Sequence, residues 1–542
     1  MGKTTNKTVS YVPLALLILA QFGISSDTTT VALAANSVVN QLGGGMVDIQ
    51  LANMVFGLIS GIFMISGGMT GLIIGWSNNF RLGVLLALMG ELAMSFAPNT
   101  AVFIFVGRVL VGLGASFLIP SVLGIVPALY EKSKRVFAYG CVTAGTGAAA
   151  LMPVPFGIML DTVGFRVTFA VMAGLFLVLL VFSIRLPKIE RQTVSRRFDV
   201  PGFVACSIGF FFLLVSITCI STCGIVVPLP TAPFTLFGIA PTLPMATFGI
   251  LSLVVFSRIE KSREAKGLSL LMPRSFLGTS AARHSLVAVA FGFFLSGAFN
   301  LLIIPYLQIA AGLSALESGL MFACAGVPMV VCAVFIPKLF PAVSPRRIIQ
   351  LGYCVGAVGC FTSAFGLGQS NLVVYVAVGM FLAGVGIGLV NSHASYSVAC
   401  SVGEKDVQQS GGIQGTVRNI AHSLAAAVLG TLLVLVLTVT YPIAVAESPA
   451  LTAVTKDILI TSPVSFSSDV VFEATLASAG VSADESEPAM TAYRQARLEA
   501  NQLSLAILGC GTVLLLLFTR NLPMCGSGKR AEKKISDKVS NA

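Results

Sequence analysis

Charged residues are scarce in this sequence. Only 10% of its 542 residues are Asp, Glu, Lys or Arg, whereas 56% are hydrophobic. A soluble protein carries about 25% charged residues, so most of this chain must have an apolar surrounding, and for this length that surrounding is lipid. The composition therefore predicts an integral membrane protein.

Motifs that would indicate other functions are also missing. The 11 cysteines form no C-x-x-C pair, and we interpret them as small packing residues without a metal site. No complete G-x-x-x-x-G-K-[ST] motif for nucleotide binding occurs, since the Gly2-Lys3-Thr4 run has no room for the first glycine. No nucleophile–base set or metal cluster is evident. We therefore expect no enzyme, no cofactor and no ATPase, and any uphill transport must draw on an ion gradient.

Apolar runs long enough for membrane-spanning helices follow one another along the chain. A span needs about 20 mostly apolar residues, and about fourteen such runs can be placed. The first exceeds a signal-peptide core and has no small-residue cleavage site, so we expect it to be retained. The runs begin near Tyr11, Leu51, Arg81, Ala101, Val136, Val167, Gly202, Leu236, Leu286, Gly319, Ile348, Leu372, Ile413 and Leu503. Pro241 and Pro244 are expected to kink the eighth.

The distribution of basic residues predicts the orientation. With both termini in the cytoplasm, nearly all of the 33 Lys and Arg residues fall on the cytoplasmic side, as the positive-inside rule requires. The exceptions outside are Arg166, Lys456, Arg494 and Arg497. This asymmetry explains the net charge of +11 by contact with anionic lipid. It predicts a multi-pass plasma-membrane protein that binds no nucleic acid, and we expect a monomer.

The same topology divides the chain into segments. Residues 440–499 are hydrophilic and net acidic, and we expect an extracellular loop with little function of its own. The predicted segments are a cytoplasmic N-terminus (1–10), a six-helix half (11–187), linkers with two extra helices (188–283), a second six-helix half (284–519) and a basic cytoplasmic tail (520–542).

Three charged residues lie well inside predicted spans, namely Asp27, Glu91 and Arg108. Charges in the membrane are costly and usually functional. Asp27 could bind a proton or a cationic substrate, or serve only as a hydrogen-bond partner near the outer water. Arg108 needs a carboxylate partner, and both Asp27 and Glu91 lie at a similar depth. Such a pair could couple proton release to a conformational change, or it could be a static structural ion pair.

The helices of the second half carry uncharged polar residues. They could line a solute path, although each alone is typical of interhelical hydrogen bonding. They are Asn300, Gln308, Asn391 and His393, with Gln414 and Asn419 further along. Arg418 is expected near the cytoplasmic start of its helix, where the topology rule accounts for it.

Several motifs occur in an order and spacing that cover nearly the whole chain. Together they resemble those of the fourteen-helix drug/proton antiporters of the major facilitator superfamily. The first helix carries Asp27 and Thr29. The fourth-helix pattern is Gly107-Arg108, Gly112 and Gly114. The fifth-helix antiporter motif contributes Gly147, Pro153 and Gly157. Further matches are Arg135, Asp161, Gly164-Phe165-Arg166, Arg197 to Gly202, Tyr306 to Gly319, and Gly412 with Arg418.

The resemblance implies an all-α major facilitator fold, with two six-helix halves and two inserted central helices. It implies alternating access, proton coupling or substrate binding at Asp27 and Arg108, and export of small molecules that are often lipophilic cations. Two motifs depart from the family pattern. Gly75 and Asn78 replace an acidic residue and a glycine in the loop after the second helix, and Met152 and Phe156 replace two glycines of the fifth-helix motif, which should pack less closely.

Three functions are therefore considered. The first is a proton-coupled exporter of amphipathic or cationic small molecules. The second keeps the fold but exports or facilitates an endogenous metabolite or lipid. The third is a membrane sensor derived from a transporter, which the retained Asp27 and Arg108 disfavour because buried charges are costly.

Overall fold

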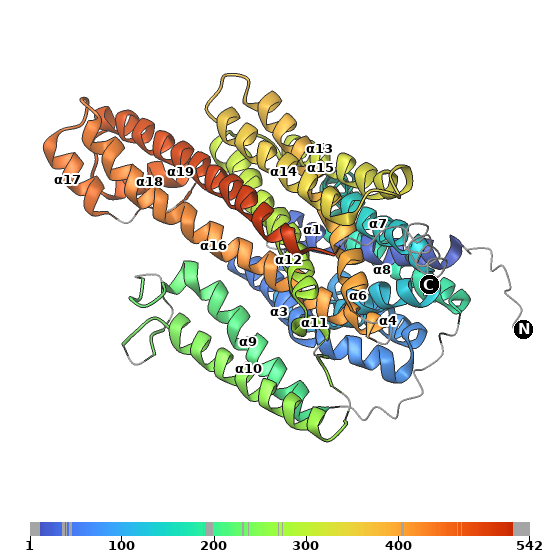
Figure 1. The fold of residues 1–542 in the computed structure, drawn as a ribbon. Helices are drawn as coiled ribbons and strands as arrows, with labels where there is room; N and C mark the ends of the chain where they lie inside the picture. The colour runs from blue at the N-terminus through green and yellow to red at the C-terminus, as the bar shows by residue number, and fades with distance from the viewer. Residues whose placement is uncertain are drawn as a thin grey trace, which may run out of the picture.

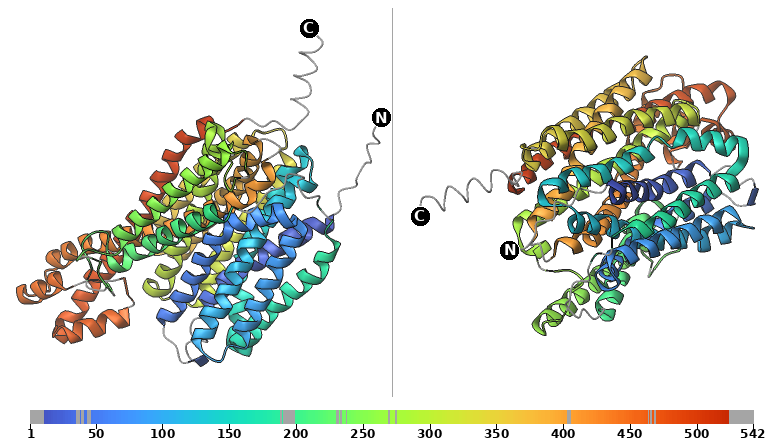
Figure 2. Two further views of the ribbon diagram at one scale, coloured as in Figure 1. Left: turned by 90° about the horizontal axis from the view of Figure 1, so that it is seen from below. Right: turned by 90° about the vertical axis from the view of Figure 1, so that its right-hand side faces the viewer.

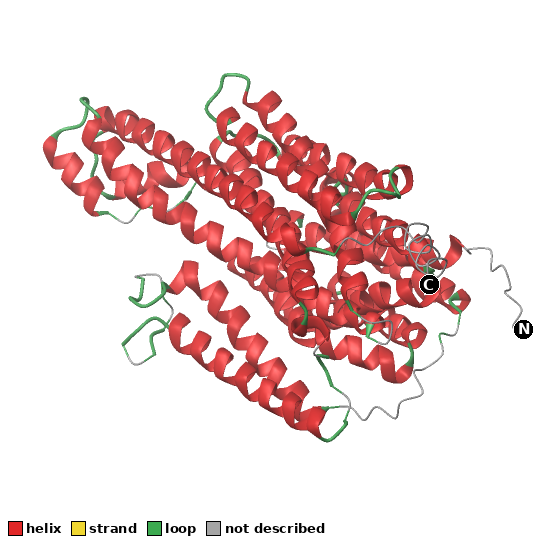
Figure 3. Ribbon diagram, in the orientation of Figure 1, coloured by secondary structure: helices red, strands yellow, loops and turns green. Residues whose placement is uncertain are grey.

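The computed structural model describes residues 11–523, apart from 35–37, 39–40, 43–45, 188, 190–198, 230–231, 233, 237, 269, 274, 403–405, 463, 465 and 468. All regular elements among these residues are helices (Figure 3). The predicted N-terminal segment and all but the first residues of the basic tail lie outside the described residues.

The first half of the chain forms one helical bundle. Its spans are α1 (Tyr11–Leu33), α3 (Met46–Ile74), α4 (Trp76–Ser95), the continuous α5 (Thr100–Val102), η1 (Phe103–Arg108) and α6 (Val109–Leu129), then α7 (Lys132–Ala149) and α8 (Pro153–Phe182), which a short turn, η2 (Ser183–Arg185), follows. Within α8, Gly164 has φ 80° and breaks the helix. This break separates the predicted fifth and sixth spans.

Two further helices form a hairpin at the edge of the bundle. They are α9 (Val200–Cys223) and α10 (Thr242–Ala265), which lie beside one another in Figure 1. The helix α10 begins later than the sequence predicted, because Pro241 stands at its N-cap and Pro244 in its first turn. Proline is tolerated there, where its missing N–H has no helical partner anyway, so the expected kink does not arise.

The second half repeats the bundle architecture. Its elements are the short α11 (Ser275–Gly278), α12 (Ser280–Pro305) with η3 (Tyr306–Ala310), α13 (Ala315–Leu339), α14 (Pro345–Gly366), α15 (Leu372–Ser401) with η4 (Val407–Gln409), α16 (Ser410–Glu447), α17 (Ala453–Thr461), α18 (Asp469–Ser478), and α19 (Ala483–Phe518) with η5 (Thr519–Asn521). Two further views show its helices running alongside those of the first half (Figure 2).

Thirteen stretches of the described residues are long and apolar enough to cross a membrane. The predicted third span, α4, is not among them, and it carries Asn78, Asn79, Arg81 and Glu91. Twelve of its 20 residues are nevertheless buried in the bundle. Added Cβ atoms at Gly83 and Gly90 would come within 3 Å of α6, so these glycines let α4 and α6 approach closely.

Small residues also join the two halves. A Cβ at Gly412 of α16 would lie 3.1 Å from the Gly68 Cα of α3, and one at Gly326 of α13 would lie 2.9 Å from the Gly147 carbonyl oxygen of α7. Gly140 of α7 is in similarly close contact with Ala333 of α13. Because only glycine leaves room for such backbone approach, these contacts hold the halves together.

Residues 440–499, which the sequence predicted to be an extracellular loop, are mostly helical. The C-terminal part of α16 and the N-terminal part of α19 continue beyond the neighbouring helices and carry α17 and α18 between them (Figure 1). We call this unit the helical lobe. The rings of Phe472 and Tyr493 stack with centroids 3.8 Å apart, and Tyr441 packs edge-on against both. The lobe therefore has an aromatic core of its own.

Ion pairs close the helical lobe around Asp469. The carboxylate accepts hydrogen bonds from Arg494 and from the buried Arg497. Partial burial alone would raise the pKa of Asp469, but the hydrogen bonds and charges of Arg494 and Arg497 outweigh it and hold the pKa below its ordinary value.

The lobe should therefore loosen in acid. A carboxylate whose pKa is lower in the folded protein stabilises the fold above its unfolded pKa of about 3.9 and loses this effect as the pH falls through the folded value. We expect amide protection factors in α18 to decrease below about pH 4, measured by hydrogen exchange. Asp469→Asn should show lower protection at neutral pH and no acid step, and an identical acid step in this variant would contradict the assignment.

Candidate functional site

The most deeply buried ion pair of the described residues joins the first and fourth spans. Both oxygens of Asp27 in α1 accept hydrogen bonds from Nη1 of Arg108, at 2.9 and 2.7 Å. Neither side chain is exposed. The structure thus brings together the two residues that the sequence singled out, and it selects Asp27 as the partner that Arg108 requires.

Neighbouring groups also bind part of the Arg108 guanidinium. Its Nε donates to the Ala52 carbonyl of α3 at 3.2 Å, and its Cζ lies 4.6 Å from the centre of the Phe56 ring. The Nη2 atom has no hydrogen-bond partner among the described residues. Arg108 is also the last residue of the π-helical turn η1. Such turns within α-helices occur frequently at functional sites, and no sequence pattern predicted this one.

Glu91 of α4 is the third member of the site. It is fully buried and interacts electrostatically with both Asp27 and Arg108. Apart from Asp27, no described group is placed to bind its carboxyl oxygens. Three spans therefore bring two carboxyl groups and one guanidinium into a single dry cluster, which we call the Asp27 cluster.

The fourth-helix glycines let these helices approach. A Cβ at Gly114 would lie 2.7 Å from the Ala87 nitrogen of α4, and one at Gly112 would lie 3.1 Å from Ile59 of α3. Gly107, next to Arg108, is in equally close contact with Met94. Larger residues would push α4 and α3 away from α6, and with them Glu91 and the Ala52 carbonyl.

The altered loop after the second span is held by neutral contacts. Nδ2 of the buried Asn79 donates to the carbonyls of Gly67 and Phe117, both at 3.0 Å, and to Ser121 Oγ at 2.8 Å. The buried Trp76 ring fills the space between Gly71 and Gly124. Hydrogen bonds and ring packing thus fasten α4 to α3 and α6 at the Gly75 turn, and no sequence pattern predicted these roles of Asn79 and Trp76.

The fifth-helix motif is split between two helices. Gly147 lies near the end of α7 in close contact with Val330 of α13, whereas Pro153 begins α8 next to Gly319. A Cβ atom added at Gly157 would meet no other atom within 4 Å. None of the three touches the Asp27 cluster, so any role in transport would act through the packing of the two halves.

Four of the predicted polar residues of the second half, Asn300, Gln308, Asn391 and His393, do not meet in one place. Asn300 is partly buried in α12 and Gln308 is exposed in η3. Asn391 and His393 are buried in the second part of α15. The His393 ring bonds to its own helix, through Nδ1 with Ser392 Oγ and the Leu389 carbonyl. The partners of His393 are therefore local.

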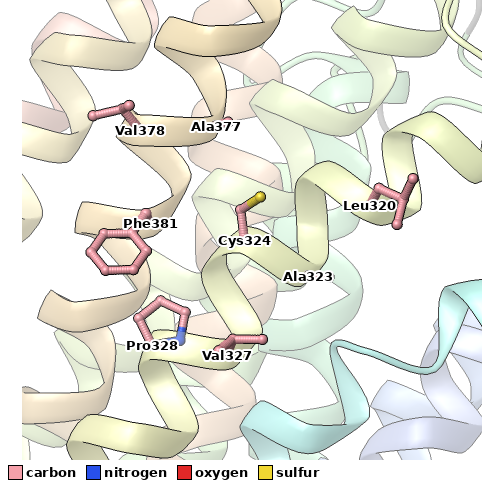
Figure 4. Close-up of a pocket in the computed structure, with 8 residues that line it drawn as sticks. All are labelled: Leu320, Ala323, Cys324, Val327, Pro328, Ala377, Val378 and Phe381. Atoms are coloured by element: carbon pink, nitrogen blue, oxygen red, sulfur yellow. The ribbon is translucent and has the colours of Figure 1, made fainter.

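The pocket in Figure 4 is separate from all these residues. It lies between α13 and α15, and its lining is apolar: Leu320, Ala323, Cys324, Val327, Pro328, Ala377, Val378 and Phe381. Several of these side chains are exposed. It therefore resembles a groove on the apolar flank of the second half rather than a polar solute site.

Comparison with known proteins decides the family. The model of the Major Facilitator Superfamily matches residues 16–426. The chain belongs to the major facilitator superfamily. Solved structures of this superfamily share the fold: the human organic anion transporter MFSD10 has a TM-score of 0.58 at 12% identity and covers 95% of this chain and 100% of its own. The proton:xylose symporter XylE has a TM-score of 0.57 at 12% identity, with 96% and 98% covered.

Curated relatives within the superfamily are export and resistance proteins. The tetracenomycin C resistance and export protein of Streptomyces glaucescens is 26% identical over 76% of this chain and 73% of its own length. The probable actinorhodin transporter of Streptomyces coelicolor is 24% identical over 78% and 72%. The quinolone resistance protein NorB of Staphylococcus aureus is 22% identical over 68% and 78%. These relatives agree with the drug-efflux group that the sequence motifs resembled, and they indicate a membrane transporter rather than an enzyme.

Proposed function

We propose that this major facilitator protein exports an amphipathic small molecule in exchange for protons. The observation that carries the proposal is the Asp27 cluster, in which two carboxyl groups share one buried guanidinium. The names of the relatives support export as the direction of transport.

Charge balance explains how such a cluster would bind a proton. With both carboxyl groups ionised, Arg108 neutralises only one of them, and an excess negative charge remains out of contact with water. Burying an uncompensated charge costs several kcal/mol. A single proton shared between Asp27 and Glu91 removes the excess charge.

Movement of the helices would then release the proton. Asp27, Glu91 and Arg108 lie on three different spans, α1, α4 and α6, so a rearrangement that opens the site to water changes the solvation of all three. Once hydrated, both carboxyl groups can be charged without cost to the fold. Alternating access around the two halves would thus take up a proton on one side and release it on the other.

The relatives suggest the first compounds to test. Their names include tetracenomycin C, puromycin, quinolones and lincomycin, a panel that covers several charges and sizes. An endogenous metabolite or lipid remains the alternative cargo, and a sensor without transport remains the alternative from another class.

Flux in liposomes tests the proposal. The full chain is reconstituted, an acid lumen is imposed, and uptake of each compound is followed with and without nigericin, which collapses the pH gradient. We expect uptake of at least one compound that nigericin abolishes. Flux insensitive to nigericin would indicate an uncoupled facilitator, and the absence of flux for a panel extended to lipids and metabolites would favour the sensor.

A further inference from the structure

Arg418 of α16 is a buried cation that forms no ion pair with any carboxylate of the described residues. Its side chain is 6% exposed, and its Nη2 donates to Ser395 Oγ of α15 at 2.7 Å. Its Cζ lies 4.7 Å from the centre of the Phe293 ring of α12. No carboxylate of the described residues forms an ion pair with it, and its Nε has no hydrogen-bond partner there. The topology rule does not explain such burial.

Polar side-chain atoms without partners in the described part of the chain lie on α15 and α16, one turn from Ser395 and from Arg418. Ser395 Oγ also bonds to the carbonyl of Asn391, one turn earlier on α15, at 3.0 Å. Asn391 is 1% exposed, yet neither its Oδ1 nor its Nδ2 has a partner among the described residues. The same holds for Oε1 of Gln414, one turn before Arg418. Since buried polar groups are normally hydrogen-bonded, these atoms have the character of a binding site. We call Arg418, Asn391, Ser395, Gln414 and Phe293 the Arg418 cluster.

The cluster lies where the two halves meet. Tyr139 of α7, in the first half, interacts electrostatically with Arg418, while Ser395 and Phe293 belong to the second half. One turn further along α16, His422 is exposed, although Arg418, Ala425 and Leu429 on the same helix face are buried. The Arg418 cluster is therefore one helical turn from an accessible position on this inward face.

We propose that the Arg418 cluster binds the carboxylate or phenolate of the exported molecule. A guanidinium without a counter-ion compensates an anion, the Nε–H of Arg418 and the Nδ2–H of Asn391 can donate to its oxygens, and the Phe293 ring offers an apolar face to an aromatic body. In the Asp27 cluster, by contrast, both Asp27 oxygens already bind Arg108. This assignment of the substrate class rests on the proposed export function.

Two dyes of opposite charge test the assignment. Fluorescein is anionic and rhodamine 6G is cationic, but both share a xanthene ring system. Binding of each to the full chain in phosphatidylcholine nanodiscs is measured by fluorescence anisotropy, without any gradient. We expect fluorescein to bind, and Arg418→Gln to weaken it at least about tenfold, which corresponds to the loss of a charged hydrogen bond. Rhodamine 6G affinity should change less than about twofold.

Three controls make the result specific. Arg418→Lys keeps the charge and should retain part of the affinity. Arg494→Gln removes an exposed arginine of the helical lobe and should have no effect. Asn391→Leu removes only the unpartnered amide and should leave the fold intact while weakening fluorescein at least about threefold, so the test survives if Arg418→Gln fails to fold.

Each outcome decides the assignment. Absence of fluorescein binding, equal affinity in Arg418→Gln and Asn391→Leu, or an equal loss for rhodamine 6G would overturn it. Fluorescein binding that phosphatidylglycerol nanodiscs suppress in wild type would assign the cluster to lipid headgroups instead. Arg418-dependent binding without proton-driven flux would refute the export function alone, and proton-driven flux of anions unaffected by Arg418→Gln would refute the anion site alone.

Discussion

Replacing Asp27 with asparagine should abolish proton-driven uptake while the protein remains folded. Asparagine has nearly the same shape, and its Oδ1 can still accept a hydrogen bond from Arg108, but it cannot release a proton. In liposomes with an acid lumen, we expect uptake of the transported compound to fall to the level of protein-free liposomes. Equilibrium binding of fluorescein should stay within about threefold of wild type, because the Arg418 cluster is intact.

The matched control for this variant is Asp457→Asn, which makes the same chemical change at an exposed position of the helical lobe. Its uptake should equal that of wild type. Uptake by Asp27→Asn that persists and remains sensitive to nigericin would move the coupling role to Glu91, and Glu91→Gln would then be the variant to lose it.

Removing Arg108 should have the largest effect on stability. Arg108→Gln leaves Asp27 and Glu91 buried beside one another without a cation, and breaking a buried pair in this way costs about 3–5 kcal/mol. Adding Asp27→Asn removes one of the two uncompensated charges. The double variant should therefore recover most of the free energy of unfolding, but it should not transport. Unfolding of the purified chain in detergent, followed by heat or denaturant, measures both.

The double variant separates this account from simple loss of packing. Two neighbouring substitutions that act through one charge pair are not additive, and here the second is expected to be stabilising. If Arg108→Gln with Asp27→Asn were as unstable as the two single losses together, the charge argument would be wrong and shape alone would explain the effect.

Most of the fold could be predicted because apolar runs report membrane spans directly. The helix boundaries were predicted least well where contacts other than those with lipid determine the length of a helix. The helices α16 and α19 extend beyond their apolar segments, because the aromatic core of Tyr441, Phe472 and Tyr493 stabilises their extended ends. These residues are far apart in the sequence and fall in an alanine-rich, polar stretch, so neither hydropathy nor spacing indicated that they pack together.

The sequence predicted the depth of the charged residues along their spans, but it did not predict toward which neighbouring helix each side chain points. Counting residues from the ends of the spans placed Asp27, Glu91 and Arg108 at a common level. Which carboxylate faces the arginine depends on helix rotation, which α6 adjusts through the π-helical turn before Arg108. Arg418 was misjudged for the same reason: its position along α16 could be predicted, and the structure adds that its side chain is buried, where no carboxylate of the described residues pairs with it.

The most direct test of the central claim is whether outward movement of the cargo carries protons the other way. Liposomes are loaded with the compound that showed the largest flux and diluted into compound-free buffer at equal pH, and a trapped dye reports the lumenal pH. The account predicts that the lumen acidifies as the compound leaves, and that Asp27→Asn abolishes this acidification. Efflux from wild-type liposomes at constant lumenal pH would contradict proton exchange at the Asp27 cluster.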